Sequence, residues 1–179
     1  MTLTLETARL ILRPVSPDDV EPHAAMLADP GFAEFMSPDK KPLSREAAWR
    51  IFAILIGHWE IRGFGFFSVF EKASGRWMGR VGPWMPEGWP GLECGWSIAP
   101  GYWGRGYAGE AAVAAINWIF DEKPDLSRII SLIAPANAKS QAVAHKIGEE
   151  KTAEIFMFDP TTPLDIWAAD RDQWQATFG

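Results

Sequence analysis

The chain has little of what several classes of protein require. Its one cysteine, Cys94, excludes an internal disulfide framework and any cysteine-based zinc cluster. The three histidines are far apart and share no metal-ligand spacing, so we expect no metal site. No basic run occurs, and 17 Lys and Arg stand against 23 Asp and Glu, a net charge of -6. This balance argues against a nucleic-acid partner, because such a protein needs a basic surface to neutralise phosphates.

Long apolar runs are also missing. No stretch approaches the roughly 20 residues that cross a bilayer. The first residues lack the basic start and apolar core of a signal peptide. The apolar fraction of 47% and the charged fraction of 22% are nevertheless those of a chain that can bury a core. We therefore expect one cytoplasmic domain over residues 1–179, a monomer or homodimer with no membrane partner.

The hydrophobic pattern predicts an α/β (α+β) fold. From alternation, β-branched content and flanking Gly and Pro, we expect strands at residues 9–13, 66–71, 76–81, 92–98, 128–134, 153–158 and 165–169. From capping residues and helical spacing, we expect helices after Ser16, from Ser44 to Gly63, at 109–120 and at 140–147. This order predicts a mixed, mostly antiparallel sheet of about seven strands with helices on both faces.

The most informative segment is the glycine-rich turn at residues 100–106, which follows a strand and opens a helix. Such a turn presents unpaired backbone N–H groups together with the positive end of the helix dipole. At Gly104 and Gly106 a side chain would keep a ligand away from the backbone. The pattern therefore favours binding of an anion, above all a pyrophosphate.

Two other interpretations of this turn stay open. Gly104, Gly106 and Gly109 match the dinucleotide-binding fingerprint, which would make the protein an oxidoreductase. That fold places the first glycine at the tip of the first strand, whereas three expected strands precede the turn here. The second alternative is a glycine turn that binds no ligand.

Residues 103–108 resemble the coenzyme A pyrophosphate loop of the GNAT superfamily of N-acetyltransferases, and in particular its RimJ/RimL-type branch. Residues 7–14, followed by Asp18 and Asp19, are similar to the first strand and helix of that branch. Residues 137–148 look like its stretch after the fifth strand. Three positions depart from the family pattern: Trp103 replaces a Gln or Arg, Ala144 a Tyr found in many relatives, and Glu149 a Phe.

The resemblance implies direct transfer of an acetyl group from acetyl-CoA to a primary amine, either a protein N-terminus or a small molecule. Coenzyme A would lie beside a splayed strand at residues 92–98. An N–H of Ser97 or Ile98 would polarise the thioester carbonyl, and Asn137 would bind the pantetheine arm. The remaining residues that the resemblance assigns to the coenzyme are Trp103, Gly104, Gly106, Tyr107, Ala108, Gly109 and Ser140. Arg105 and Lys146 are candidate phosphate partners, and their alternative role is that of solvated surface charges.

Two side chains are candidates for proton transfer. Glu93 shares a strand face with Gly95 and Ser97 and is the candidate general base, acting through water. Its alternative role is that of a strand carboxylate in a hydrogen-bond network. Ser140 is the candidate acid that protonates the leaving thiolate, and its alternative role is to cap the helix at 140–147.

Tryptophan is unusually frequent, with ten residues against two tyrosines. Trp59, Trp84 and Trp89 are candidate walls of the amine site, with core packing as the alternative. A catalytically idle acyl-CoA-binding or sensing protein is a further interpretation, because of Trp103 and the missing tyrosine.

Overall fold

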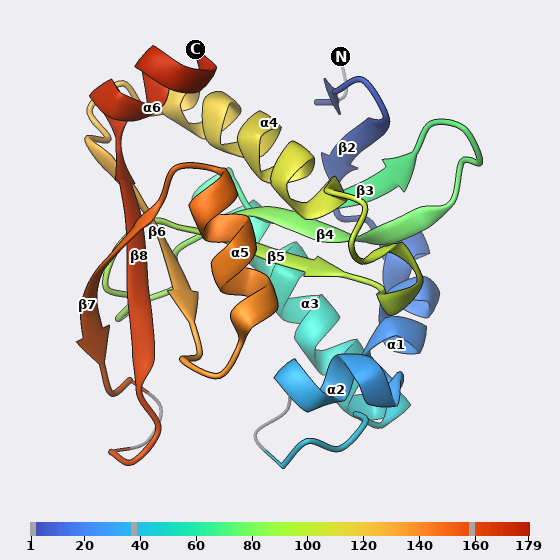
Figure 1. Ribbon diagram of the computed structural model, residues 1–179. Coiled ribbons are helices and arrows are strands. Elements are labelled where there is room, and N and C mark those ends of the chain that lie inside the picture. Colours follow the sequence, from blue (N-terminus) through green and yellow to red (C-terminus); the bar gives the residue numbers. More distant parts are fainter. Residues whose placement is uncertain (1–2, 37–38, 158–159) are drawn as a thin grey trace.

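The computed structural model describes residues 3–36, 39–157 and 160–179. Within these residues the chain forms one eight-stranded sheet in the order β1-β2-β3-β4-β5-β6-β8-β7 (Figure 1). The strands are β1 (Leu5–Glu6), β2 (Leu10–Pro14), β3 (Phe67–Glu71), β4 (Trp77–Trp84), β5 (Glu93–Ile98), β6 (Arg128–Ile133), β7 (Glu150–Ile155) and β8 (Leu164–Asp170). The helices are α1 (Val20–Leu27), α2 (Pro30–Met36), α3 (Arg45–Arg62), α4 (Tyr107–Glu122), α5 (Ala138–Lys146) and α6 (Arg171–Phe178).

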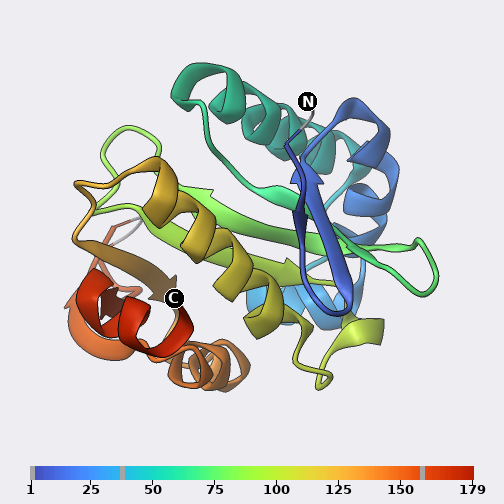
Figure 2. The same cartoon turned by 90° about the horizontal axis from the view of Figure 1, so that it is seen from above.

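Helices cover both faces of the sheet, as predicted. Figure 2 shows α3 on one side of the central strands and α4 on the other. Helix α1 packs on α3, while α5 and α6 both contact α4. The main core fills the space between α4 and the sheet, where Ala111, Ala115 and Ile116 are fully buried against Phe67 and Val81. None of the described helices is long and apolar enough to cross a membrane.

Local capping explains the helix that the sequence placed most accurately. The Ser44 side chain accepts a hydrogen bond from the Ala47 N–H and begins α3, and Gly63 ends it in the left-handed conformation. Helix α1 is anchored differently. Asp19, which precedes it, is buried and forms a bidentate ion pair with Arg13 of β2. The same carboxylate accepts a hydrogen bond from Ser68 of β3, so α1 is held to two strands.

The feature that shapes the site is the divergence of β5 from β6. Seven strand pairs form the sheet, and among the described residues β5 and β6 make the one parallel pair. Their ladder has a single register pair, Glu93 with Ile130, whereas β4 and β5 pair along their whole length. Beyond Glu93 the two strands separate, which confirms the predicted splay of 92–98. The dinucleotide interpretation is wrong, because it requires the glycine turn to follow the first strand and five strands precede it here.

The structure corrects the predicted element list in several places. Strand β1, helix α2 and helix α6 were not predicted: β1 has two residues, and Pro30 and Gly31 in α2 resemble a turn. Strand β7 begins at Glu150, whereas the sequence predicted residue 153. The prediction missed the true start because the side chains of β7 are mostly exposed and no hydrophobic alternation marks its ends. The predicted end of that strand, Phe158, lies outside the described residues.

Two glycines let neighbouring strands approach. Gly79 has a φ of +154°, and a Cβ built there would lie 2.1 Å from the Ser97 carbonyl oxygen of β5. Gly82, with a φ of +152°, would place its Cβ 2.9 Å from the Gly65 carbonyl oxygen. A backbone oxygen cannot move aside as a side chain does, so these positions fix how β4 sits in the sheet.

We therefore expect Gly79→Ala to lower the free energy of unfolding by about 3 kcal/mol, through overpacking and backbone strain. Urea denaturation of the purified protein measures this. Gly57→Ala in α3 is the matched control: a Cβ there meets nothing within 4 Å, so the change should stabilise the helix by about 0.5–1 kcal/mol. Equal effects of the two substitutions would contradict this role of Gly79 in β4.

Candidate functional site

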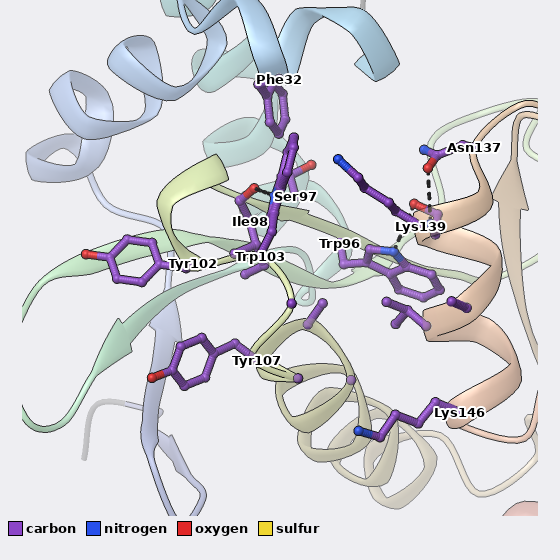
Figure 3. Close-up of a pocket in the computed structure, with 17 residues that line it drawn as sticks. Phe32, Trp96, Ser97, Ile98, Tyr102, Trp103, Tyr107, Asn137, Lys139 and Lys146 are labelled. Atoms are coloured by element: carbon purple, nitrogen blue, oxygen red, sulfur yellow. Dashed lines mark hydrogen bonds between the residues drawn. The ribbon is translucent and has the colours of Figure 1, made fainter.

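A cavity of about 460 Å³ lies between the start of α4, the free edge of β5, and α5 (Figure 3). It brings together the predicted residues Ser97, Ile98, Trp103, Gly104, Gly106, Tyr107, Ala108, Gly109, Asn137, Ser140 and Lys146. It is also lined by residues that were not predicted: Phe32, Trp96, Tyr102, Lys139, Ala142 and Val143. Arg105, which was predicted, does not line it. Most of the surface is apolar, with polar groups at particular points.

The glycine loop begins α4 at one end of this cavity. Gly104 and Gly106 have φ values of +73° and +79°, and Gly106 is the N-cap of the helix. A Cβ at Gly106 would lie 3.6 Å from both Arg9 Nη2 and Lys146 Nζ. Two cations therefore flank the free N–H groups of the helix. Arg9 was missed as a site residue, although it belongs to the sequence motif that suggested the family.

Arg9 is positioned by the loop itself. Its side chain forms an ion pair of 2.6 Å with Glu110 in the first turn of α4 and donates a hydrogen bond to the Arg105 carbonyl. Thr7 adds a hydrogen bond of 2.5 Å to the same carboxylate. The N-terminal segment and the glycine loop are thus joined by one polar cluster.

Trp103 fastens the other side of the loop to β5. Its indole N–H donates to the Ile98 carbonyl at 2.6 Å, and Lys139 Nζ of α5 lies 4.0 Å from its ring centre. The tryptophan that replaces the usual Gln or Arg therefore ties the loop to the end of the splayed strand.

Alternation along β5 determines which backbone groups face the gap. The Ser97 carbonyl points to β4, since it lies against Gly79, and the Ala99 N–H donates to Met78 of β4. The Ile98 and Cys94 carbonyls point the other way, because Trp103 and Ser131 bond them. The N–H of Ile98 therefore faces the gap, while that of Ser97 faces β4.

Helix α5 contributes Asn137 and Ser140. Asn137, not Ser140, caps this helix: its side-chain oxygen accepts from the Ser140 N–H at 3.1 Å, so the capping role for Ser140 was wrong. The Ser140 hydroxyl instead accepts from the Trp96 indole N–H at 3.3 Å, and both side chains line the cavity. Because the oxygen is already an acceptor, its own proton remains available to a group in the cavity.

Glu93 lies on the opposite face of the sheet, at the point where the strands separate. Its carboxylate accepts a hydrogen bond from the Trp89 indole at 2.7 Å. Burial raises the pKa of Glu93 to about 7, against the opposing effects of Trp89, the Leu132 backbone and the Arg80 charge. A carboxyl group that titrates near neutral pH suits a general base.

Glu149 is a second carboxyl group at the gap. It is 1% exposed and lies against Ser131 of β6, whose strand neighbours Ile129 and Ile133 pack on the α4 and α5 side of the sheet. Ser131 Oγ is 2.9 Å from both the Cys94 carbonyl and Glu149 Oε1, but a hydroxyl carries only one proton. Both hydrogen bonds form fully when Glu149 brings a proton of its own. Burial, with a contribution from Glu93, raises the pKa of Glu149 to about 8 despite the Ser131 hydrogen bond.

The three tryptophans predicted to line the amine site lie in different environments. Trp89 contacts Glu93, and Trp84 stacks on His58 with ring centres 4.2 Å apart. His58 is buried and joins Phe64 to the Met85 N–H, so it holds the turn that carries both tryptophans. Trp59 does not line the cavity; its indole donates to the Phe66 carbonyl, and its ring packs on Phe67 and Trp118.

Neither the Cys94 thiol nor a metal site adds a reactive group within the described residues. Cys94 is buried in the core, and burial together with Glu149 and Glu93 raises the pKa of its thiol well above the usual value. A thiol of this kind is a poor nucleophile. In the part of the chain that the structure describes, no group of three His, Cys, Asp or Glu side chains could hold a metal ion.

The raised pKa of Glu149 has a consequence for stability. An unfolded chain loses this proton near pH 4.5 and the folded protein near pH 8, so stability falls as pH rises through that window. Gln supplies an amide N–H donor in place of the carboxyl O–H and cannot ionise. We expect the stability of Glu149→Gln relative to the wild type to rise by up to about 1.4 kcal/mol per pH unit in that window and to level off above it.

Urea denaturation at several pH values between 5 and 9 measures this difference. Glu150→Gln at the exposed neighbouring position is the control and should show no such trend. A stability difference for Glu149→Gln that is independent of pH would mean that this carboxyl group ionises normally in the folded protein.

Comparison with known proteins agrees with this geometry. Residues 9–150 match the family model described as an acetyltransferase (GNAT) domain. The curated protein YkkB of Bacillus subtilis, described as uncharacterized, is 35% identical over 88 residues, which is 48% of this chain and 51% of that protein. The match thus spans about half the length of this curated relative.

Solved structures are similar over nearly the whole chain. An acetyltransferase from Agrobacterium tumefaciens is 31% identical with a TM-score of 0.81, covering 94% of this chain and 95% of that one. A ribosomal-protein-S5-alanine acetyltransferase from Vibrio fischeri (20% identity, TM-score 0.70, coverage 96% and 98%) shares the fold. So does a spermidine N-acetyltransferase from Vibrio cholerae, solved with CoA and spermine (15%, TM-score 0.72, coverage 94% and 99%). The family match covers well over half of the chain, and the protein therefore belongs to the GNAT acetyltransferase family.

Proposed function

We propose that the protein transfers an acetyl group from acetyl-CoA to a primary amine, directly and within a ternary complex. The observation that carries this proposal is the cavity that joins the start of α4 to the free edge of β5. Its two ends suit the two parts of one ligand: an anionic group at the helix, and a polar chain along the strand.

The glycine loop is suited to a pyrophosphate. The free N–H groups at the start of α4 point toward the cavity end, and Gly104 and Gly106 leave them accessible. Lys146 supplies positive charge beside Gly106, where Arg9, paired with Glu110, also lies. In a protein with a net charge of -6, binding of a multiply charged anion depends on such local donors. Arg105 does not line the cavity, so the proposal assigns the phosphate contacts to the helix N–H groups and Lys146.

The edge of β5 is suited to an extended amide chain. Ile98 turns its N–H toward the gap, where it is a donor for the thioester carbonyl, and Asn137 retains its side-chain NH₂ because only its oxygen caps α5. Bound acetyl-CoA supplies the activated acetyl group. The chain's own residues then hold the carbonyl and move protons, a task in which preorganised donors act most strongly away from water.

Glu93 and Ser140 are the proposed proton carriers. Glu93 accepts the proton of the attacking amine, through water, and its raised pKa makes it a stronger base than an ordinary carboxylate. Ser140, oriented by the Trp96 indole, donates a proton to the departing thiolate. We infer a primary amine as the acceptor from the names of two structures that share the fold. One is named for a ribosomal protein and the other for spermidine, and both are amines.

We expect acetyl-CoA at about 100 times its dissociation constant to stabilise the protein by roughly 2.7 kcal/mol, a rise in Tm of about 5–10 °C. Differential scanning fluorimetry with acetyl-CoA and NADH measures this. Lys146→Met should reduce the shift, because it removes a cation beside the loop, whereas Lys40→Met at an exposed position should not. A shift with NADH and none with acetyl-CoA would overturn the proposal.

The base is tested by the pH dependence of kcat/KM, followed through release of the free thiol over a panel of amines. The wild type should lose activity as pH falls through about 7, where Glu93 becomes protonated. Glu93→Gln should remove this acidic limb and lower the rate about 10²–10⁴-fold. Trp89→Phe should move the limb to higher pH, because the indole hydrogen bond lowers the pKa of Glu93.

An unchanged pH profile in both variants would exclude Glu93 as the base. No release of thiol with any amine would favour an idle acyl-CoA-binding protein.

A further inference from the structure

A second, smaller cavity is bounded by β4 and by residues of helices α1, α2 and α3. Its volume is about 70 Å³. Its walls are mostly apolar, formed by Leu27, Phe32, Ala33, Leu43 and Ile51. Among the described residues, its two polar members are both cations, Arg80 of β4 and Lys41 in the segment between α2 and α3. This lining therefore holds two positive charges and no acid to balance them.

Arg80 is a buried charge without a counter-ion. It is 8% exposed, and its Nε has no hydrogen-bond partner among the described residues. None of the ion pairs that these residues form involves Arg80. The buried acids on the same face have other partners, since Asp19 pairs with Arg13 and Glu93 accepts a hydrogen bond from Trp89. A buried cation in this situation favours a complementary anion, which offsets the cost of its burial.

The guanidinium of Arg80 remains charged and able to donate. Burial lowers the pKa of Arg80 to about 10, which still leaves the group protonated at neutral pH. It lies over the Phe66 ring, 4.2 Å from the ring centre. This stacking uses one face of the planar group, whereas its N–H donors lie in the plane. The donors are thus free to bind a group inside the cavity.

The chemistry of the lining favours an anion over water. A buried water molecule needs two to four polar partners, some of which must accept its own protons. The lining side chains cannot accept a hydrogen bond, because arginine and lysine are donors only and the other members are apolar. An anion requires donors alone. The volume of about 70 Å³ corresponds to about two water molecules at roughly 30 Å³ each, so the anion must be small.

We propose that this cavity binds a small monovalent anion, such as chloride or formate, between Arg80 and Lys41. The site is independent of acetyl transfer. Because Arg80 belongs to a central strand and Lys41 to the segment between α2 and α3, the anion ties this segment to the sheet. Phe32 of α2 lines this cavity and the large one, so the same anion supports one wall of the proposed coenzyme site.

Differential scanning fluorimetry of the protein without coenzyme A tests the site. Sodium chloride or sodium formate replaces sodium gluconate stepwise at constant ionic strength, because gluconate is too large for the cavity. The Tm of the wild type should rise along a saturation curve, by about 3–6 °C at ten times the dissociation constant. Arg80→Met should abolish the rise, and Arg50→Met, at an exposed position of α3, should retain it. An equal rise in Arg80→Met, or no saturable rise with either anion in the wild type, would overturn the inference.

A second variant keeps the test decisive if Arg80→Met does not fold. Lys41 is exposed, so Lys41→Met leaves the core intact. It should raise the dissociation constant of the anion at least about threefold, because it removes one of two attracting charges. Lys40→Met, at the exposed neighbouring position, should leave the dissociation constant unchanged. Equal effects of the two lysine substitutions would contradict the site.

The NMR linewidth of the chloride resonance reports binding directly. The folded wild type should broaden this resonance, and added formate should narrow it again by competition for the same cavity. Arg80→Met, or Lys41→Met where the former does not fold, should reduce the broadening. A linewidth that the wild type does not change would also overturn the inference.

Discussion

The site depends on one constraint, which is that β5 pairs fully with β4 but meets β6 only at Glu93 and Ile130. A strand edge inside a protein exposes N–H and C=O groups that must find partners. The chain satisfies part of this edge itself: Ser131 bonds the Cys94 carbonyl, and Trp103 bonds the Ile98 carbonyl. The rest of the edge, together with the start of α4, forms the wall against which coenzyme A is proposed to lie.

The same divergence concentrates buried charge. Glu93 and Arg80 lie on one face of the sheet and Glu149 on the other, and burial shifts the pKa of each toward its uncharged form. Glu93, when ionised, adds to the effect of burial in raising the pKa of Glu149. A proton on Glu149 completes the link from Ser131 to β5, while Glu93 remains free to accept one. The environments of two similar groups thus separate their roles.

The sequence predicted most of the fold and the glycine turn that begins α4, because these depend on local signals. Ser44 and Gly63 mark the ends of α3 directly. In the glycine loop, Gly104 and Gly106 adopt the positive φ values that glycine favours, so the residue type itself indicates the conformation. What the sequence could not predict depends on residues that are distant along the chain. Arg9 reaches the loop from the N-terminal segment, and its Nη2 would lie 3.6 Å from a Cβ at Gly106. Glu149 was visible as a departure from the family pattern, but its link to Ser131 required the structure.

Amide hydrogen exchange on adding coenzyme A is the sharpest test of whether one ligand occupies both the β5 edge and the start of α4. We expect slower exchange at the Trp96 and Ile98 N–H groups, which face the gap, and at the first amides of α4. We expect no change at Ala99, whose N–H already donates to Met78 of β4. Protection of the α4 amides and of the two β5 amides together would support a single ligand that spans both. Unchanged exchange at Trp96 and Ile98 in the presence of bound coenzyme A would contradict it.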